Sequence, residues 1–119
     1  MTKQRKAIGR YGETLAASHL EKLGYQVIER NWTSRLGELD IIAISDNQVI
    51  ICEVRTTTQT YFGYGFQSVD RKKQQKLQRL ALQYVAEKGW SHLNIRMDVI
   101  SVLLDGQRNL VDLKHIQGI

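Results

Sequence analysis

The sequence lacks the residues and segments that mark several classes of protein. Its single cysteine, Cys52, excludes an intramolecular disulfide and a zinc site built from several cysteines. It has no proline, no repeat, no low-complexity stretch and no evident linker, so we expect one domain over residues 1–119. No apolar run approaches the roughly 18 to 20 residues of a membrane span. The basic start, MTKQRKAIGR, is not followed by the apolar segment of a secretory signal, so we expect a cytoplasmic protein.

Acidic side chains are fewer than basic ones. The formal net charge is +5 and the isoelectric point is about 9.5. A basic domain attracts polyanions, of which nucleic acid is the commonest, through phosphate contacts and counterion release. The alternative is an ordinary protein surface with a modest lysine excess. Hydrophobic residues make up 42% of the chain, which suffices for one real core.

Hydrophobic periodicity predicts two helices and five strands. The helices are expected at about residues 8–23 and 69–87, and the strands at Gln26–Trp32, Glu38–Ser45, Gln48–Thr56, Ile95–Leu104 and Leu110–Ile116. The order α-β-β-β-α-β-β predicts an α/β fold with a mixed central sheet flanked by helices. The aromatic, glycine-rich segment Tyr61–Phe66 is expected to be a loop. The loop either stacks on unpaired bases, or it covers the sheet or forms a dimer contact.

Acidic residues lie inside the hairpin GELDIIAISDNQVIICEVRTTT, where a strand would normally be buried. Side chains alternate between faces along a strand, so Glu38 and Asp40 should share one face, with Leu39 and Ile41 on the other. A turn centred on residues 46 and 47 then puts Asp40 directly across from Glu53. The same register puts Glu38 across from Arg55.

Two carboxylates at that range repel each other, and partial burial strengthens the repulsion. This repulsion is relieved if Asp40 or Glu53 is protonated, or if a cation lies between them. The alternative to a metal site is that the two acids form an ordinary polar edge of the sheet. Mg²⁺ is held in this way, by one or two carboxylates together with carbonyls, water and substrate phosphates. Arg55 should point to the same face, and Lys73 lies in the middle of the apolar face of the second helix. A metal and cations around one spot are the parts needed for phosphodiester hydrolysis.

Asp40, twelve intervening residues and then Glu53-Val54-Arg55 resemble the PD-(D/E)xK signature of restriction-endonuclease-like nucleases. The successive blocks RYGETLAASHLEKLGYQVIERNW, RLGELDIIA, ICEVRT, SVDRKKQQKL and IRMDVI are similar to those of the YraN-like family. That family comprises uncharacterised bacterial proteins related to archaeal-type Holliday junction resolvases. The resemblance covers nearly the whole chain and implies a restriction-endonuclease-like fold.

The resemblance also implies roles for single residues. Asp40 and Glu53 would be ligands of Mg²⁺ or Mn²⁺, the Val54 carbonyl would offer a third ligand, and Glu13 of the first helix would complete the site. Lys73 matches the helix lysine of the family. In the late R-x-D block, Arg96 and Asp98 are expected to have a structural role.

The chain departs from the superfamily pattern at two positions. Leu39 replaces the proline that often precedes the first aspartate, and Arg55 replaces the signature lysine. Arginine stays protonated, so it cannot act as a general base, but it can bind a phosphate or orient a hydroxide.

Three functions remain open from the sequence. The first is a metal-dependent DNA endonuclease acting on branched or other non-canonical DNA, with Glu13, Asp40, Glu53, Arg55 and Lys73 in its catalytic site. The second is a nucleic-acid-binding module that keeps the fold without useful catalysis, and the third is an interaction protein with an exposed acidic edge. In the first two, DNA would be guided by basic residues at five positions: Arg10, Arg30, Arg35, Lys72 and Lys76. A homodimer is a further expectation, because resolvase-like relatives cut two strands symmetrically.

Overall fold

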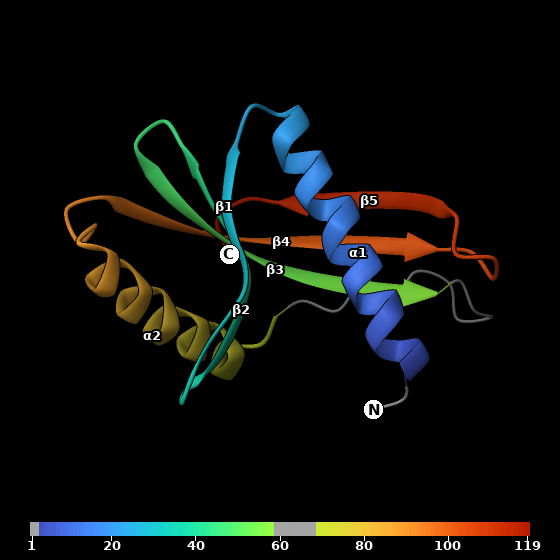
Figure 1. The fold of residues 1–119 in the computed structure, drawn as a ribbon, viewed down its shortest axis with the longest axis horizontal. Helices are drawn as coiled ribbons and strands as arrows, with labels where there is room; N and C mark the ends of the chain where they lie inside the picture. The colour runs from blue at the N-terminus through green and yellow to red at the C-terminus, as the bar shows by residue number, and fades with distance from the viewer. Residues whose placement is uncertain (1–2, 59–68) are drawn as a thin grey trace.

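The computed structural model describes residues 3–58 and 69–119. The elements follow the predicted order (Figure 1): α1 (Lys3–Lys22), β1 (Gln26–Ser34), β2 (Gly37–Ser45), β3 (Gln48–Thr58), α2 (Arg71–Lys88), β4 (Asn94–Leu104) and β5 (Leu110–Ile116). The predicted α/β class is therefore confirmed. The segment Tyr61–Phe66, for which we expected a stacking or covering loop, lies outside the described residues.

The five strands form one mixed sheet in the order β1-β2-β3-β4-β5. Three neighbouring pairs are antiparallel, and β3 pairs with β4 in parallel. A parallel pair cannot be joined by a tight hairpin and needs a longer crossover, which here contains α2. The central strands β2, β3 and β4 carry most of the buried residues, whereas β1 and β5 are the sheet edges.

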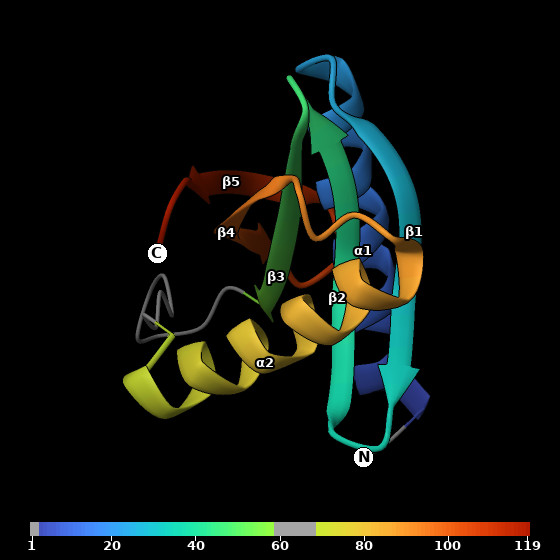
Figure 2. The same ribbon diagram turned by 90° about the vertical axis from the view of Figure 1, so that its left-hand side faces the viewer.

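Each face of the sheet is covered by one helix (Figure 2). The core on the α2 face includes Ile42, Ile51, Leu77, Leu80 and Tyr84. The core on the α1 face is built from other residues of the same strands, together with one side of α1: Ala16, Leu20, Ile41, Cys52 and Ile100. Because side chains alternate along β2 and β3, both cores draw on the same two central strands.

The helix ends follow local chemistry. The first helix begins at Lys3 instead of about residue 8, because Lys, Gln, Arg and Ala in the first turns all favour helix. It ends before Gly24, whose φ of 89° only glycine adopts easily. Asp70 caps α2 by accepting the Lys73 N–H at 2.8 Å, and Gly89 ends it at φ 73°. Within the described residues, neither helix is long and apolar enough to cross a membrane.

The turn between β2 and β3 sets the register of the hairpin. Asp46 and Asn47 have φ angles of 51° and 62°, the left-handed pair that a two-residue type I′ turn requires. Ser45 therefore pairs with Gln48, and the regular pairing continues to Ile41 with Cys52. This is the register predicted from the sequence.

Candidate active site

The regular pairing of β2 with β3 ends just before Asp40. Beyond the Ile41–Cys52 pair, Oδ2 of Asp40 accepts the backbone N–H of Val54 at 2.9 Å. Leu39 packs in the α2-side core, whereas Ile41 packs in the α1-side core. The expectation that these two residues share a face is therefore wrong, because the alternation breaks at Asp40. This break turns the Asp40 carboxylate sideways towards β3.

The Asp40 and Glu53 carboxyl groups nevertheless lie next to each other and interact directly, as predicted. Each residue is only 9% exposed. Burial, followed by the negative charge of Glu53, raises the pKa of Asp40 to about 7, although the Val54 N–H opposes the shift. Asp40 therefore takes up a proton close to neutral pH. Protonation of Asp40 and binding of a cation are the two ways to relieve this repulsion.

Two basic side chains surround Glu53. Its Oε1 lies 3.6 Å from Lys73 Nζ and 3.9 Å from Arg55 Nε. Among the described residues, Arg55 forms its ion pair with Glu53 and not with Glu38, which corrects the cross-strand pair expected from the register. The side chains of Arg55 and Lys73 remain 34% and 37% exposed. Both cations can therefore reach an anion from solvent while they balance the charge of Glu53.

A glycine contact brings α1 close to this end of β3. A Cβ placed on the buried Gly12 would collide with the side chain of Thr56. The helix can approach the strand this closely only because residue 12 has no side chain. The next residue, Glu13, is thereby carried to within electrostatic range of Asp40.

Glu13 is partly buried and incompletely satisfied. Burial, and then the charge of Asp40, raise the pKa of Glu13, whereas a hydrogen bond from Asn31 and the charge of Arg30 lower it. Arg30 Nη2 lies 4.0 Å from Oε1 of Glu13 and donates to Thr14 Oγ1 at 3.0 Å. In the described part of the chain, the buried Oε1 of Glu13 has no hydrogen-bond partner. A buried oxygen in that state is a position where a water, an ion or a substrate group can bind.

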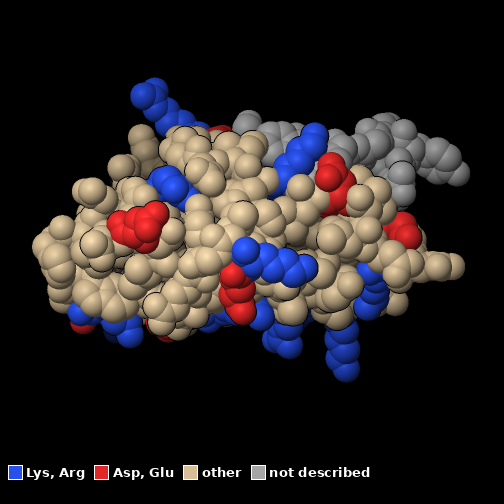
Figure 3. Space-filling view, turned by 90° about the horizontal axis from the view of Figure 1, so that it is seen from above, with Lys and Arg blue, Asp and Glu red and all other residues tan. Residues whose placement is uncertain are grey.

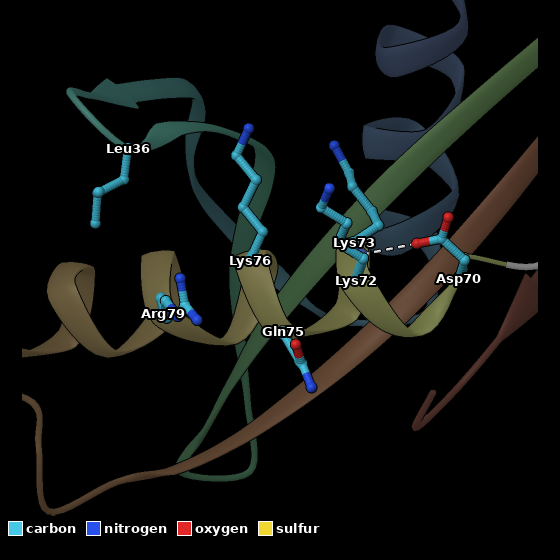
Figure 4. A pocket seen from close by; sticks show the side chains of 7 residues that line it. All are labelled: Leu36, Asp70, Lys72, Lys73, Gln75, Lys76 and Arg79. Atoms are coloured by element: carbon cyan, nitrogen blue, oxygen red, sulfur yellow. Dashed lines mark hydrogen bonds between the residues drawn. The ribbon is translucent and has the colours of Figure 1, made fainter.

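Basic residues line two hollows on either side of these acids. The first is a groove of about 540 Å³ along α2 (Figure 4), lined by Leu36, Asp70, Lys72, Lys73, Gln75, Lys76 and Arg79. The three lysines extend from one side of α2, whereas Gln75 points the other way. The second hollow has about 480 Å³ and is lined by Arg5, Lys6, Gly9, Arg10, Glu13, Asn31 and Glu38. Over the face seen in Figure 3, basic and acidic side chains are interspersed and form no single basic patch.

The five basic residues expected to guide nucleic acid occupy different surroundings. Lys72 and Lys76 line the α2 groove, and Arg10 lines the second hollow. Arg30 is held against α1 beside Glu13. Arg35 is exposed in the β1–β2 turn and lines neither hollow.

Several lining residues were not predicted. Arg79 was not among the expected binding residues, yet it lines the same groove as Lys72, Lys73 and Lys76. Its signal was in the sequence, since Lys72, Lys76 and Arg79 have the i, i+4, i+7 spacing of one helix stripe. Arg5, Lys6 and Asn31 gave no comparable signal, because their position depends on how α1 packs beside β1.

The donor set favours a hard cation at two carboxylates. Among residues 3–58 and 69–119, no group of three or more His, Cys, Asp or Glu side chains is arranged to hold a metal ion. That Glu13 completes the site as a third ligand stays a prediction. Two adjacent carboxylates still match Mg²⁺ and Mn²⁺, which bind oxygen and keep water or substrate phosphate as further ligands. Burial and the charge of Glu53 raise the pKa of Asp40, and a cation bound between the two carboxylates would oppose that shift.

Arg96 and Asp98 lie on the opposite, α1 face of the sheet. Asp98 is fully buried and pairs across the sheet with the core residue Cys52. Arg96 donates to both of its oxygens at 2.8 Å, and His115 Nε2 lies 2.8 Å from Oδ2. The Gly118 N–H donates to Oδ1 at 3.1 Å. Burial alone would raise the pKa of Asp98, but these bonds lower it to about 2. This cluster is satisfied internally, as a structural role requires.

Comparison with known proteins gives the family. The model of the uncharacterised protein family UPF0102 matches residues 12–102. A UPF0102 protein of Caldanaerobacter subterraneus subsp. tengcongensis is 37% identical over 113 residues, covering 94% of this chain and 93% of that protein. One from Mycolicibacterium vanbaalenii is 39% identical over 118 residues, covering 99% and 97%. One from Mycobacterium sp. strain JLS is 40% identical over 117 residues, covering 97% and 86%. The matched residues include both acidic strands, α2 and the part of α1 from Gly12 onwards, and the chain belongs to the UPF0102 family.

Proposed function

We propose that the protein is a Mg²⁺- or Mn²⁺-dependent DNA endonuclease of the Holliday-junction-resolvase-like type. It would hydrolyse phosphodiester bonds in branched or other non-canonical DNA, in the cytoplasm. The observation that carries this proposal is the buried Asp40–Glu53 pair, which lies beside two cations that remain accessible to solvent. A purely structural buried aspartate would be expected to find its partners within the fold, as Asp98 does, whereas Asp40 has one backbone donor and a second carboxylate beside it.

Asp40 and Glu53 would hold the metal ion, with the Val54 carbonyl as an additional oxygen ligand. When bound, the ion would polarise the phosphoryl oxygen and balance charge that develops there. It would also relieve the repulsion that now raises the pKa of Asp40, so that both carboxylates are ionised at neutral pH. Metal affinity should therefore rise with pH as Asp40 loses its proton.

Lys73 and Arg55 would bind the non-bridging oxygens of the scissile phosphate. Both already lie within 4 Å of Glu53 Oε1 and keep part of their side chains in solvent. Since Arg55 stays protonated, the proton of the attacking water needs another acceptor. Glu13 suits this step, because its pKa is raised and its Oε1 has no hydrogen-bond partner in the described structure. Water would attack phosphorus and pass its proton to Glu13, and the bond to the leaving oxygen would break, with that oxygen taking a proton from solvent water.

The two basic hollows would hold the DNA backbone on either side of the acids. Lys72, Lys76 and Arg79 would contact phosphates along the α2 groove. Arg10, with its neighbours in the second hollow, would contact phosphates beyond Glu13. Binding through several such contacts should weaken steeply with salt.

The test measures metal binding, DNA binding and cleavage on the same proteins. Wild type, Asp40→Asn and Glu53→Gln are titrated with Mg²⁺ and Mn²⁺ and incubated with four-way junction, flap, single-strand and duplex DNA. Asp46→Asn is the matched control, because it removes the same charge from an exposed turn position that asparagine tolerates. We expect metal to raise the melting temperature of wild type and the control at pH 8, and to have no such effect on Asp40→Asn.

Metal-dependent cutting by wild type and the control, lost in Asp40→Asn while DNA binding persists, would support the endonuclease. A second candidate is a binding module without catalysis, favoured by Arg55 at the position of the signature lysine and by the absence of a three-ligand group in the described chain. Salt-sensitive DNA binding in all variants, with no cutting in any metal, would support that module. If wild type binds no DNA, both proposals fail.

A further inference from the structure

The strand β5 forms an open edge of the sheet on which apolar side chains are exposed. It pairs with β4 on one side and is the last strand in the sheet order (Figure 1). Leu110, Val111 and Ile116 are 46%, 48% and 39% exposed. Sheet edges are normally blunted by bulges or by inward charges, because an unpaired edge attracts another strand. The opposite edge, β1, has such a protection in the register shift between Val27 and Glu29. On β5 the register shifts once, near Val111, and the pairing with β4 is regular from Asp112 to Ile116.

The backbone of β5 is ready for one more strand. The N–H of Leu113 donates to its neighbour's side chain, Asp112 Oδ1, at 2.9 Å. It therefore points away from β4, and by alternation so does the N–H of His115. The short side chain of Asp112 covers the N–H of Leu113 in the middle of this edge. A strand placed there would replace that cover with a backbone hydrogen bond.

We propose that the occupant of this edge is a second copy of the same chain, with β5 of one copy antiparallel to β5 of the other. In a two-fold symmetric antiparallel pair, opposed side chains lie on the same face. The pairing must therefore be centred on a residue, and near the middle of β5 the choices are Asp112, Leu113 and Lys114.

Charge selects one of these three registers. Centring on Asp112 would oppose two aspartates, and centring on Lys114 would oppose two lysines. Centring on Leu113 opposes Asp112 of each copy to Lys114 of the other, so that two complementary charge pairs form. Leu110 lies beyond the register shift, on the other face of the sheet from Ile116, and takes no part in this pairing. Opposite charges and apolar pairs across strands stabilise a sheet, whereas like charges in opposition destabilise it.

The resulting dimer has one continuous sheet through both copies. The two-fold axis stands perpendicular to the sheet, so each face of one copy continues into the same face of the other. Both α2 helices, and with them both Glu53 side chains, would lie on one side of the joined sheet. This interface is independent of the proposed function, because it uses no residue of the candidate site.

Charge reversal tests the proposal. Sedimentation velocity is measured over a concentration series for wild type, Asp112→Lys, Lys114→Asp and the variant carrying both changes. Each single change opposes like charges twice, so we expect the dimer dissociation constant to rise roughly tenfold or more. The double change restores opposite charges and should return the constant to near the wild-type value. Glu21→Lys, a charge reversal at an exposed position of α1, should leave it unchanged.

Cysteine cross-linking tests the register. Residues opposed in a hydrogen-bonded pair have Cα atoms about 5.5 Å apart, which falls within the range of a disulfide. Leu113→Cys should therefore oxidise to a covalent dimer, whereas Val111→Cys should not, because its opposite residue is His115. The native Cys52 is buried and does not compete. A wild type that stays monomeric throughout, single reversals that leave the dimer intact, or equal cross-linking at positions 111 and 113 would each overturn the proposal.

Discussion

Asp98 and Asp40 are two buried aspartates of the same sheet, on β4 and β2, with opposite surroundings. Asp98 accepts hydrogen bonds from Arg96 and the Gly118 N–H, has His115 beside it, and has its pKa lowered to about 2. Asp40 has one backbone donor, from Val54, and a second carboxylate beside it, and its pKa is raised to about 7. Burial works against ionisation in both.

The difference separates a carboxylate used for stability from one available to a ligand. The fold supplies every partner that Asp98 needs, so this residue has no unmet demand. At Asp40 the fold imposes repulsion that a proton or a cation must relieve. The candidate site therefore lowers the free energy of unfolding, whereas the cluster around Asp98 raises it.

Breaking the satisfied cluster should have the largest effect on stability. Asp98→Asn would leave Arg96 without its charge partner in a buried setting, and we expect a loss of about 3 to 5 kcal/mol in the free energy of unfolding at pH 7. Urea denaturation followed by circular dichroism measures it. The wild-type contribution requires ionised Asp98 and should fade as pH drops from about 4 towards 2. A loss under 1 kcal/mol would mean that the partners of Asp98 do not stabilise the fold, and the contrast with Asp40 would fail.

Removing the charge at the candidate site should have the opposite sign. The pKa of Asp40 is raised on folding, so wild type loses stability as pH rises from about 4 through 7. We expect Asp40→Asn to gain about 2 to 4 kcal/mol at pH 8 and little at pH 4. Denaturation curves at both pH values, with Asp46→Asn as control, measure the gain. If Asp40→Asn is less stable than wild type at pH 8, repulsion between Asp40 and Glu53 does not destabilise the fold.

Loosening the contact of α1 with β3 should affect the candidate site around Asp40 more than the cluster around Asp98. Gly12→Ala would force α1 away from Thr56, and we expect a loss of about 1 to 3 kcal/mol. Because residue 12 adjoins Glu13, NMR shifts should change most around Glu13 and Asp40. The His115 ring should change less, since it contacts α1 through His19, further along the helix. Equal changes at both ends would show that the two regions respond as one unit.

The smallest effect on stability should come from Lys73. Its ion pair with Glu53 is partly exposed, so Lys73→Met should change the free energy of unfolding by less than about 1 kcal/mol. If Lys73 contacts a phosphate, the slope of log affinity for DNA against log salt should fall by about 1. Lys88→Met is the matched control. Lys88 lies on the same helix as Lys73 and forms a similar ion pair, with Glu29 of β1. Equal slopes for both variants would remove Lys73 from the DNA interface.

The sequence alone predicted the features that depend on local rules. Asp46 and Asn47 are residues that accept the left-handed turn, and from their position the register of β2 against β3 followed. That register was enough to bring Asp40 next to Glu53. Helical periodicity likewise placed Lys73 on the inner side of α2, where it meets Glu53.

What the sequence did not predict depends on departures from regularity or on several elements at once. Strict alternation put Leu39 and Ile41 on one face, but the strand breaks its alternation at Asp40 to bond Val54. The cluster around Asp98 joins β4, β5 and the end of the chain. No spacing in the sequence reveals that His115 and Gly118 meet there.

The parallel pairing of β3 with β4 has a consequence for the order of folding. The strands β1, β2 and β3 pair with their chain neighbours through short turns, so they can assemble early. The strand β4 must wait until the crossover containing α2 is in place, because its partner β3 lies on the far side of that helix in the chain. Asp40 and Glu53 thus come together while still in water and are buried only when α2 packs on the sheet and β4 pairs with β3. If the pair holds a divalent cation, as proposed above, the cation should speed this last step and refolding without it should be slower.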